Sequence, residues 1–188
     1  KPVVEPLAQW VEDHRFGLVK WARLPVWLER PIAWALLDYT LYVWHVATHR
    51  NKFLWSLHRL HHVDADLTAS TGLRFHVGEM AASVPWRAAQ VRGIGVDPPT
   101  LHAWQRATLA AILFHHANLR LPLAFEQRLV RLIVTPRMHA IHHSDRVAET
   151  DSNWSSGLTL WDLLHGTLRL DVEQATITIG VPPPRDGA

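Results

Sequence analysis

The sequence predicts an all-α protein, and two features of the chain support that prediction. Eight of the fourteen histidines fall into three clusters with spacings of three and four residues, which places each cluster on one helix face. Prolines and glycines separate long apolar stretches, and a single run, 175–181, has the character of a strand. We therefore expect helices, a histidine-rich site where their faces meet, and a short β-like C-terminal tail.

The composition fits one domain and excludes several kinds of site. A chain of 188 residues with 48% hydrophobic content can bury one core. The absence of cysteine excludes thiolate zinc sites, iron–sulfur clusters, a cysteine nucleophile and disulfides. Any bound metal must have nitrogen and oxygen ligands. The arginines are scattered rather than clustered, which argues against a nucleic-acid partner. The same distribution is compatible with attraction to anionic lipid headgroups.

The first segment, 1–30, alternates short apolar stretches with charges and contains three of the ten tryptophans. Pro25 and Pro31 break helices there, so we expect short amphipathic helices that lie against a surface. The chain begins at Lys1 without an initiator methionine, which suggests a fragment or a trimmed product.

A long apolar helix is expected at 31–48, with Pro31 as its first residue and Asp38 as its only formal charge. At about 1.5 Å per residue, this stretch approaches the ~30 Å thickness of a hydrocarbon core. We expect a membrane-embedded helix, with a buried helix as the alternative. His45 and His49 lie at its C-terminal end.

The rest of the chain divides into shorter elements. We expect a helix at 52–63, a loop at 64–73, helical structure at 74–92 broken near Pro85, a turn at 93–99, an apolar helix at 101–119 and a short helix at 126–134. Pro182, Pro183 and Pro184 are expected to end the ordered structure.

The three histidine clusters predict a metal site. They are His45 and His49; His58, His61 and His62; and His139, His142 and His143. Neutral imidazoles from three helix faces would form a nest of nitrogen ligands for transition metals. Eight ligands are too many for one ion and about right for two.

Two further histidines, His76 and His116, lie in polar settings within apolar stretches, and including them brings the candidate set to ten. His115 points about 100° away from His116 on a helix, so we expect it to pack rather than bind metal. Ligating histidines normally donate their other N–H to a carboxylate or carbonyl. Asp38 lies seven residues before His45 within an apolar helix, so we expect it to be such an acceptor. Other acids, among them Glu79, are expected to be solvated.

Several motifs resemble the fatty acid hydroxylase / sterol desaturase superfamily of membrane-bound di-iron oxygenases. They are Asp38-Tyr39, Trp44-His45-x3-His49-Arg50, Leu54-Trp55-x2-His58-Arg59-x-His61-His62, Arg74-Phe75-His76-x2-Glu79, His116-x-Asn118, Pro136-Arg137-Met138-His139-x2-His142-His143-Ser144, Asp151-Ser152-Asn153-Trp154 and Leu160-Trp161-Asp162. They occur in order over about 36–170, most of the chain.

This resemblance implies two iron ions bound by these histidines, on the cytoplasmic side of an integral membrane protein. It implies activation of O2 to hydroxylate or desaturate a fatty acyl or sterol-like lipid, with electrons from a separate donor protein. Asn118, Asp151 and Asn153 belong to the same motifs and are expected beside the ligands, as is Asp38. We expect a catalytic domain at 31–170, a tail at 171–188, and a membrane hairpin missing upstream of 1–30.

Two other functions remain open from the sequence. A dinuclear zinc hydrolase usually mixes carboxylates with histidines, and the clusters are poor in carboxylates. A metal-binding membrane protein without catalysis would need an exchangeable site, which apolar neighbours do not favour.

Overall fold

The computed structural model describes residues 3–181, and the prediction of an all-α fold is confirmed. These residues form ten α-helices and two 3-10 helices: α1 (Val4–Asp13), α2 (Leu18–Trp21), α3 (Val26–Arg50), α4 (Lys52–His58), η1 (Thr71–Leu73), α5 (Val77–Ile94), α6 (Pro98–His116), α7 (Leu123–Leu129), α8 (Pro136–His142), α9 (Val147–Thr150), α10 (Leu160–His165) and η2 (Gln174–Thr176).

The expected β-like tail forms no strand among the described residues. Within 171–181 the chain forms η2, and Ile179 makes one isolated antiparallel bridge to Ser144. One bridge without neighbours does not make a strand, because a strand needs successive pairings along its length. Pro182, Pro183 and Pro184 lie outside the described residues.

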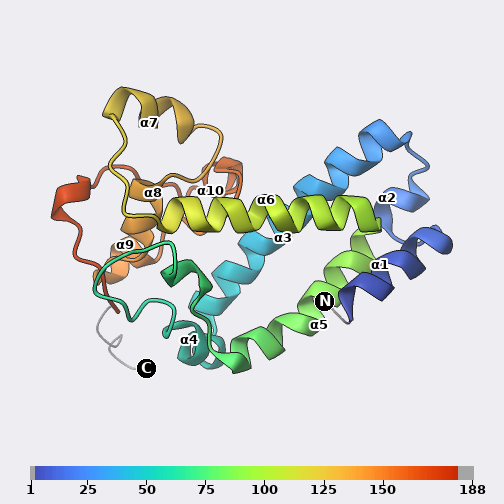
Figure 1. Ribbon diagram of the computed structural model, residues 1–188, viewed down its shortest axis with the longest axis horizontal. Coiled ribbons are helices and arrows are strands. Elements are labelled where there is room, and N and C mark those ends of the chain that lie inside the picture. The colour runs from blue at the N-terminus through green and yellow to red at the C-terminus, as the bar shows by residue number, and fades with distance from the viewer. Residues whose placement is uncertain (1–2, 182–188) are drawn as a thin grey trace.

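Three long helices, α3, α5 and α6, form the frame of the molecule: α3 packs against both α5 and α6, and α6 crosses α3 in the view of Figure 1. α1 packs on α5 and α6, and α2 packs on α3 and α5. Their contact surfaces make one apolar core, which includes Ala8, Leu37, Val91 and Leu101. Figure 1 shows α1 and α2 at one end of this frame and α4, α8 and α9 at the other. The second end brings the histidine-bearing segments together.

α3 differs from the expected helix in its start and in its surroundings. It begins at Val26, so Pro31 lies inside the helix rather than at its first position. Within residues 3–181, none of the helices combines the length and apolar character needed to cross a membrane. The expected transmembrane helix at 31–48 is therefore unsupported. The polar side chains of Glu29, Asp38 and Thr48 are buried against other parts of the protein, which is the environment of a core helix.

Prolines mislead in two other places. α5 runs without interruption through Pro85, although two pieces were expected. α6 begins at Pro98 rather than at Leu101, because proline fits the first helical position, where no N–H acceptor is needed. The side chain of Asp97 caps this helix and accepts the N–H of Thr100 at 2.7 Å. Two helices also differ in extent: α4 ends at His58 instead of residue 63, and α7 overlaps its expected range but begins and ends earlier, at Leu123 and Leu129.

The loop between α1 and α2 fits closely against the end of α5. Gly17 and Gly95 both have positive φ, 106° and 93°, and Gly95 ends α5 in the left-handed region. A Cβ on Gly17 would overlap the backbone of Gly95. This approach requires two glycines, since an L side chain would be strained and would also collide.

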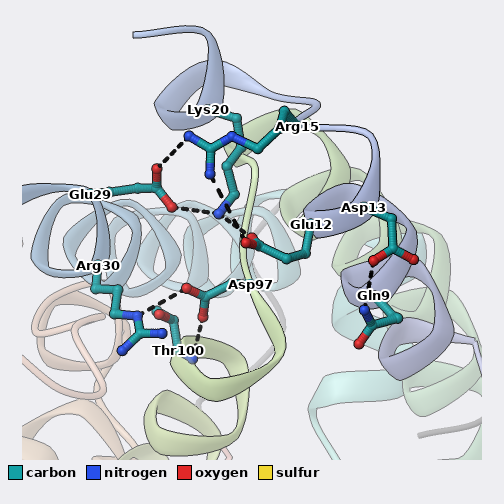
Figure 2. Close-up of polar contacts among 9 residues, drawn as sticks. All are labelled: Gln9, Glu12, Asp13, Arg15, Lys20, Glu29, Arg30, Asp97 and Thr100. Atoms are coloured by element: carbon teal, nitrogen blue, oxygen red, sulfur yellow. Dashed lines mark hydrogen bonds and ion pairs between the residues drawn. The ribbon is translucent and has the colours of Figure 1, made fainter. Parts of the chain in front are cut away.

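A buried ionic network fixes the end of the molecule that holds α1 and α2 (Figure 2). Lys20 is only 2% exposed, and its ammonium contacts Glu12 and Glu29. Arg30 on α3 pairs with Asp97 at 3.0 Å, so the network also reaches the start of α6. Oxygens of Glu12, Glu29 and Asp97 lie within 4.8 Å of one another. The cations of Lys20, Arg15 and Arg30 pair with these three carboxylates, so the group is a structural ion-pair network.

Candidate metal centre

Nine buried histidines from four parts of the chain converge at the end opposite the ionic network. α3 contributes His45 and His49, α4 and the turn after it contribute three, α6 contributes one from its last turn, and α8 with its C-cap contributes three. Contacts between α3 and α4, and between α6 and α8, bring these segments together. Histidines four residues apart, such as His45 and His49, point toward the same side because they share a helix face.

The nine imidazoles form two groups, and in each group the candidate ligand atoms lie within 4.8 Å of one another. The first group is His45, His49, His58, His62 and His142, and the second is His61, His116, His139 and His143. Neighbours in sequence therefore separate. His61 and His62 lie in the turn after α4 with ring planes 90° apart, and they join different groups. Similarly, His142 of α8 joins the first group, whereas His139 and the C-cap residue His143 join the second.

Ring nitrogens in the second group are spaced like ligands of one ion. The Nε2 atoms of His61 and His116 are 3.1 Å apart, those of His116 and His139 3.0 Å, and those of His139 and His143 3.1 Å. Metal–nitrogen bonds of about 2.0–2.1 Å at angles of about 90–110° separate two ligand nitrogens by roughly 2.9–3.4 Å. The spacing fits a metal.

Unpaired nitrogens mark the first group. Nε2 of four of its members is buried and makes no hydrogen bond within residues 3–181: His49, His58, His62 and His142. A buried polar atom without a partner costs roughly 1–3 kcal/mol, so four together are expensive unless a ligand satisfies them. A cation shared by these nitrogens would remove that cost, and the residues present therefore fit a metal ion.

Hydrogen bonds at the opposite ring nitrogen fix the orientation of several imidazoles. Backbone oxygens can only accept, so the Nδ1 atoms donate: His45 to Trp154 at 2.7 Å, His142 to Ser152 at 2.9 Å, His61 to Arg74 at 3.1 Å and His116 to Ile112 at 2.8 Å. His58 Nδ1 contacts Glu79 Oε1 at 2.9 Å. A proton held on Nδ1 leaves the lone pair on Nε2 free for a metal.

Burial favours the neutral form of several of these imidazoles. It lowers the pKa of His142 to about 3 and that of His116 to about 4. For His49, His62 and His139, burial followed by the charges of neighbouring imidazoles lowers the pKa well below its ordinary value. Neutral rings have lone pairs available at physiological pH, which metal ligation requires.

Asp38 does not have the role expected of it. Within the described residues, its Oδ2 accepts hydrogen bonds from the backbone N–H of Leu158 and from Trp161 Nε1, at 3.0 and 2.7 Å, rather than from a histidine. Burial raises the pKa of Asp38. Gly157 makes this contact possible, because a Cβ there would overlap the carboxylate. Asp38 thus fastens the 157–161 segment to α3.

The other three expected neighbours of the ligands differ from one another. Asn153 is fully buried with φ of 54°, and its amide donates to the carbonyls of Met138 and Arg169 at 2.9 and 2.8 Å. Asn153 lies between Ser152 and Trp154, whose carbonyls accept from His142 and His45. It therefore positions these two carbonyls through the backbone. Asp151 is half-buried at the C-cap of α9. Asn118 is exposed, and its amide lies 3.4 Å from Asp66.

Of the less regular histidines, the structure brings His116 into the second group but not His76. His76 is exposed and caps α5, and its Nδ1 accepts the N–H of Gly78 at 2.9 Å. Its ring is committed to this cap and lies outside both groups. His115 is buried beside His139, with ring centroids 4.1 Å apart, and also lies outside both groups.

Sequence reasoning missed Glu79, which was expected on the surface but is only 5% exposed. Its contact with His58 depends on how α5 packs against α4, which a local pattern does not encode. The one available signal was its place in the Arg74–Glu79 motif. The carbonyl acceptors of Arg74, Ser152 and Trp154 have no side-chain signature at all.

A cavity of about 550 Å³ adjoins both groups. His45 and His58 of the first group and His61, His116 and His139 of the second line it. The remaining wall is mostly apolar: α3, α5 and α6 contribute Leu41, Trp44, Met80, Val84, Leu109 and Ile112, and the segment before α5 contributes Phe75. The site can therefore hold a long apolar molecule against the imidazoles.

The known proteins to which this chain is similar are hydroxylases or monooxygenases. The family described as fatty acid hydroxylase matches residues 31–167. Ornithine lipid hydroxylase of Rhizobium tropici is 29% identical over 147 residues, which cover 78% of this chain and 43% of that protein. Human alkylglycerol monooxygenase is 24% identical over 171 residues, covering 91% of this chain and 37% of that protein. The chain spans less than half the length of these curated relatives. No solved structure matches it significantly.

Proposed function

Because this chain belongs to the fatty acid hydroxylase family, we propose that it is a non-haem di-iron oxidoreductase that hydroxylates a C–H bond of a lipid. The observation that supports this most is the pair of buried all-histidine groups beside an apolar cavity. Two relatives are named as a lipid hydroxylase and a monooxygenase, which favours hydroxylation over desaturation.

The proposed ligands are the nine histidines of the two groups, one ion to each group. His76 is left out because its ring caps α5. Two bound iron ions would supply O2 activation and oxidation of the C–H bond. Neither group contains a carboxylate among residues 3–181, so nitrogen alone would set the properties of the ions.

The protein's own residues would orient the reactants and exclude water. Hydrogen bonds at Nδ1 orient the imidazoles, so that their Nε2 atoms would be available to hold the ions. The apolar wall of the cavity would bind the hydrocarbon chain beside them, driven by burial at roughly 25 cal/mol per Å². A dry wall also keeps reactive species from water.

The partners follow from the substrate. A lipid substrate implies work at a membrane, and the exposed Trp21 and Trp27, 62% and 72% exposed, suit an interface between water and lipid. Electrons would come from a separate donor protein, as the resemblance implies. The integral membrane location and the cytoplasmic side of the site stay predictions.

Two other functions would use the same histidines. A dinuclear zinc hydrolase usually has carboxylate ligands, and the two groups contain none among the described residues. A metal-storage protein would not need an apolar cavity that reaches the ligands.

Metal content and O2 consumption test the proposal. The whole chain, reconstituted anaerobically with Fe(II), should hold two ions, and it should consume O2 when reduced in the presence of lipid. His49→Ala and His143→Ala, one from each group, should each lower the metal content and abolish turnover. His14→Ala, at an exposed position, is the matched control and should do neither.

Three results would contradict the proposal. One is a single ion per chain. Another is two zinc ions with hydrolysis and without O2 uptake. The third is equal loss of metal in all three variants, which would indicate misfolding instead of lost ligands.

A further inference from the structure

One arginine projects into the wall of the cavity from α5. The cavity is lined along this helix by Glu79, Met80, Ser83, Val84 and Arg87. These positions follow the spacing of one helix face. At one end of the stripe, Glu79 touches His58 of the first histidine group. Arg87 lies at the other end, and because it is exposed as well as part of the lining, it lies where the cavity meets solvent.

Arg87 has no ionic or hydrogen-bonding partner among residues 3–181. Among residues 3–181, no carboxylate forms an ion pair with its guanidinium, and no hydrogen bond joins it to another group. Arg30 and Arg137, by contrast, each pair with a carboxylate, at 3.0 and 2.8 Å. Apolar surroundings lower the pKa of Arg87, although an arginine remains charged at any physiological pH.

The rest of the lining offers Arg87 no compensation. Among the described residues, the one carboxylate that lines the cavity is Glu79, which contacts His58 at the far end. Gln105 of α6 also lines the cavity, and its amide has no hydrogen-bond partner among the described residues. It lies eleven residues before His116, so it too belongs to the end remote from the histidines. A cation and an amide therefore stand unpaired at the outer end of an apolar cavity.

We propose that Arg87 binds the anionic headgroup, a carboxylate or a phosphate, of the lipid whose chain occupies the cavity. This inference rests on the proposed function and adds the headgroup class of the substrate. A planar guanidinium forms paired hydrogen bonds with either anion, and these are stronger than hydrogen bonds between neutral groups. The amide of Gln105 would donate to the same headgroup.

The helix also sets the distance between headgroup and reacting carbon. Arg87 follows Glu79 by eight residues, which corresponds to about 12 Å along the axis of α5. Glu79 marks the level of His58 and hence of the first histidine group. A headgroup held by Arg87 would place a carbon well along the chain, rather than one beside the headgroup, next to the metal ligands.

Binding of simple lipids by the whole, metal-free chain tests this proposal apart from turnover. The probes are oleate, oleyl phosphate and oleyl alcohol, which share one chain and differ in headgroup. The wild-type protein should bind both anions about tenfold or more tightly than the alcohol, since hydrogen bonds to charged groups contribute about 1.5–3 kcal/mol. The preferred anion tells whether a fatty acid carboxylate or a phospholipid phosphate is the source.

The variants isolate Arg87. Arg87→Gln should bind all three probes within about twofold of its affinity for the alcohol, and Arg87→Lys should restore part of the preference. Arg106→Gln is the matched control, because it removes the same charge from an exposed position outside the cavity wall. It should keep the full preference for anions.

The outcomes separate the two proposals. Preserved discrimination in Arg87→Gln, or none in the wild type, would overturn the role of Arg87 and leave lipid hydroxylation standing. Failure of all three probes to bind would count against the proposed function itself. With iron bound, Arg87→Gln should raise KM for an anionic lipid more than it lowers kcat, and products should carry oxygen at more than one carbon.

Discussion

Replacement of Glu79 by glutamine should weaken metal binding without unfolding the protein. Glu79 is buried, and its Oε1 lies 2.9 Å from Nδ1 of His58. Glutamine keeps the shape and one acceptor oxygen but removes the negative charge. His58 would then hold its proton on Nδ1 less firmly, and its Nε2 would become a weaker ligand.

The size of the effect follows from this hydrogen bond. A hydrogen bond to a charged group contributes about 1.5–3 kcal/mol, and a neutral one about 0.5–1.5 kcal/mol. The difference, roughly 1–2 kcal/mol, corresponds to a five- to thirtyfold loss of affinity. That range overlaps the 10–100-fold losses typical of residues that orient metal ligands.

Competition with a chelator of known affinity measures the change, with the metal content of each variant as the readout. Glu173→Gln, at an exposed position, removes the same charge and is the matched control. We expect Glu79→Gln to release the more weakly held ion at lower chelator concentration, while Glu173→Gln follows the wild type. Affinity within twofold of the wild type for a folded Glu79→Gln would refute the orienting role of this carboxylate.

Three further predictions concern stability. Gly157→Ala should destabilise the protein by about 1–3 kcal/mol, because its Cβ would overlap the carboxylate of Asp38. Gly93→Ala, at a position with open space around it, should stabilise the protein by about 0.5–1 kcal/mol. Thermal unfolding of both variants tests this, and equal effects would contradict the packing. Burial alone would raise the pKa of Asp97, but hydrogen bonds from Thr100 and the pairing with Arg30 outweigh it and hold the pKa below its ordinary value of 3.8. The ionised carboxylate of Asp97 therefore stabilises the fold above pH 3.8. This contribution is lost as the pH falls through the folded pKa. Asp97→Ala should therefore lower the free energy of unfolding by about 1 kcal/mol at pH 7, and Asp97→Asn should lower it less because asparagine keeps the cap. The difference in stability between Asp97→Asn and the wild type should vanish in acid. A difference that persists at pH 2 would argue against an ionic origin. Removal of iron by a chelator should lower the unfolding temperature, since ions at about 100 times their Kd add roughly 2.7 kcal/mol, and an unchanged midpoint would mean that the unpaired imidazoles do not bind metal.

The sequence alone predicts the helical class, the three histidine clusters and the family resemblance. All three depend on local spacing. Residues three and four apart share a helix face in any fold, so the order of residues is enough to reveal a cluster such as His139, His142 and His143. Ordered motifs over most of the chain identify the family for the same reason, because they need no knowledge of packing.

Proline positions show where local rules stop. Proline predicts a helix start at Pro31 and a break at Pro85, yet both lie within continuous helices. Tertiary contacts made by the whole helix outweigh the loss of one hydrogen bond and the local crowding. The apolar run at 31–48 suggested a membrane span for a similar reason, since a buried core helix and a spanning helix have the same apolar composition.

Only the tertiary structure decides how the histidines divide and what holds them. His61 and His62 are neighbours in the chain but join different groups, because the turn after α4 points their rings apart. Glu79, rather than Asp38, reaches an imidazole, and backbone carbonyls of distant residues hold several others. These contacts join segments up to 109 residues apart, and they follow from which helix faces pack together, a property of the whole chain that no local spacing contains.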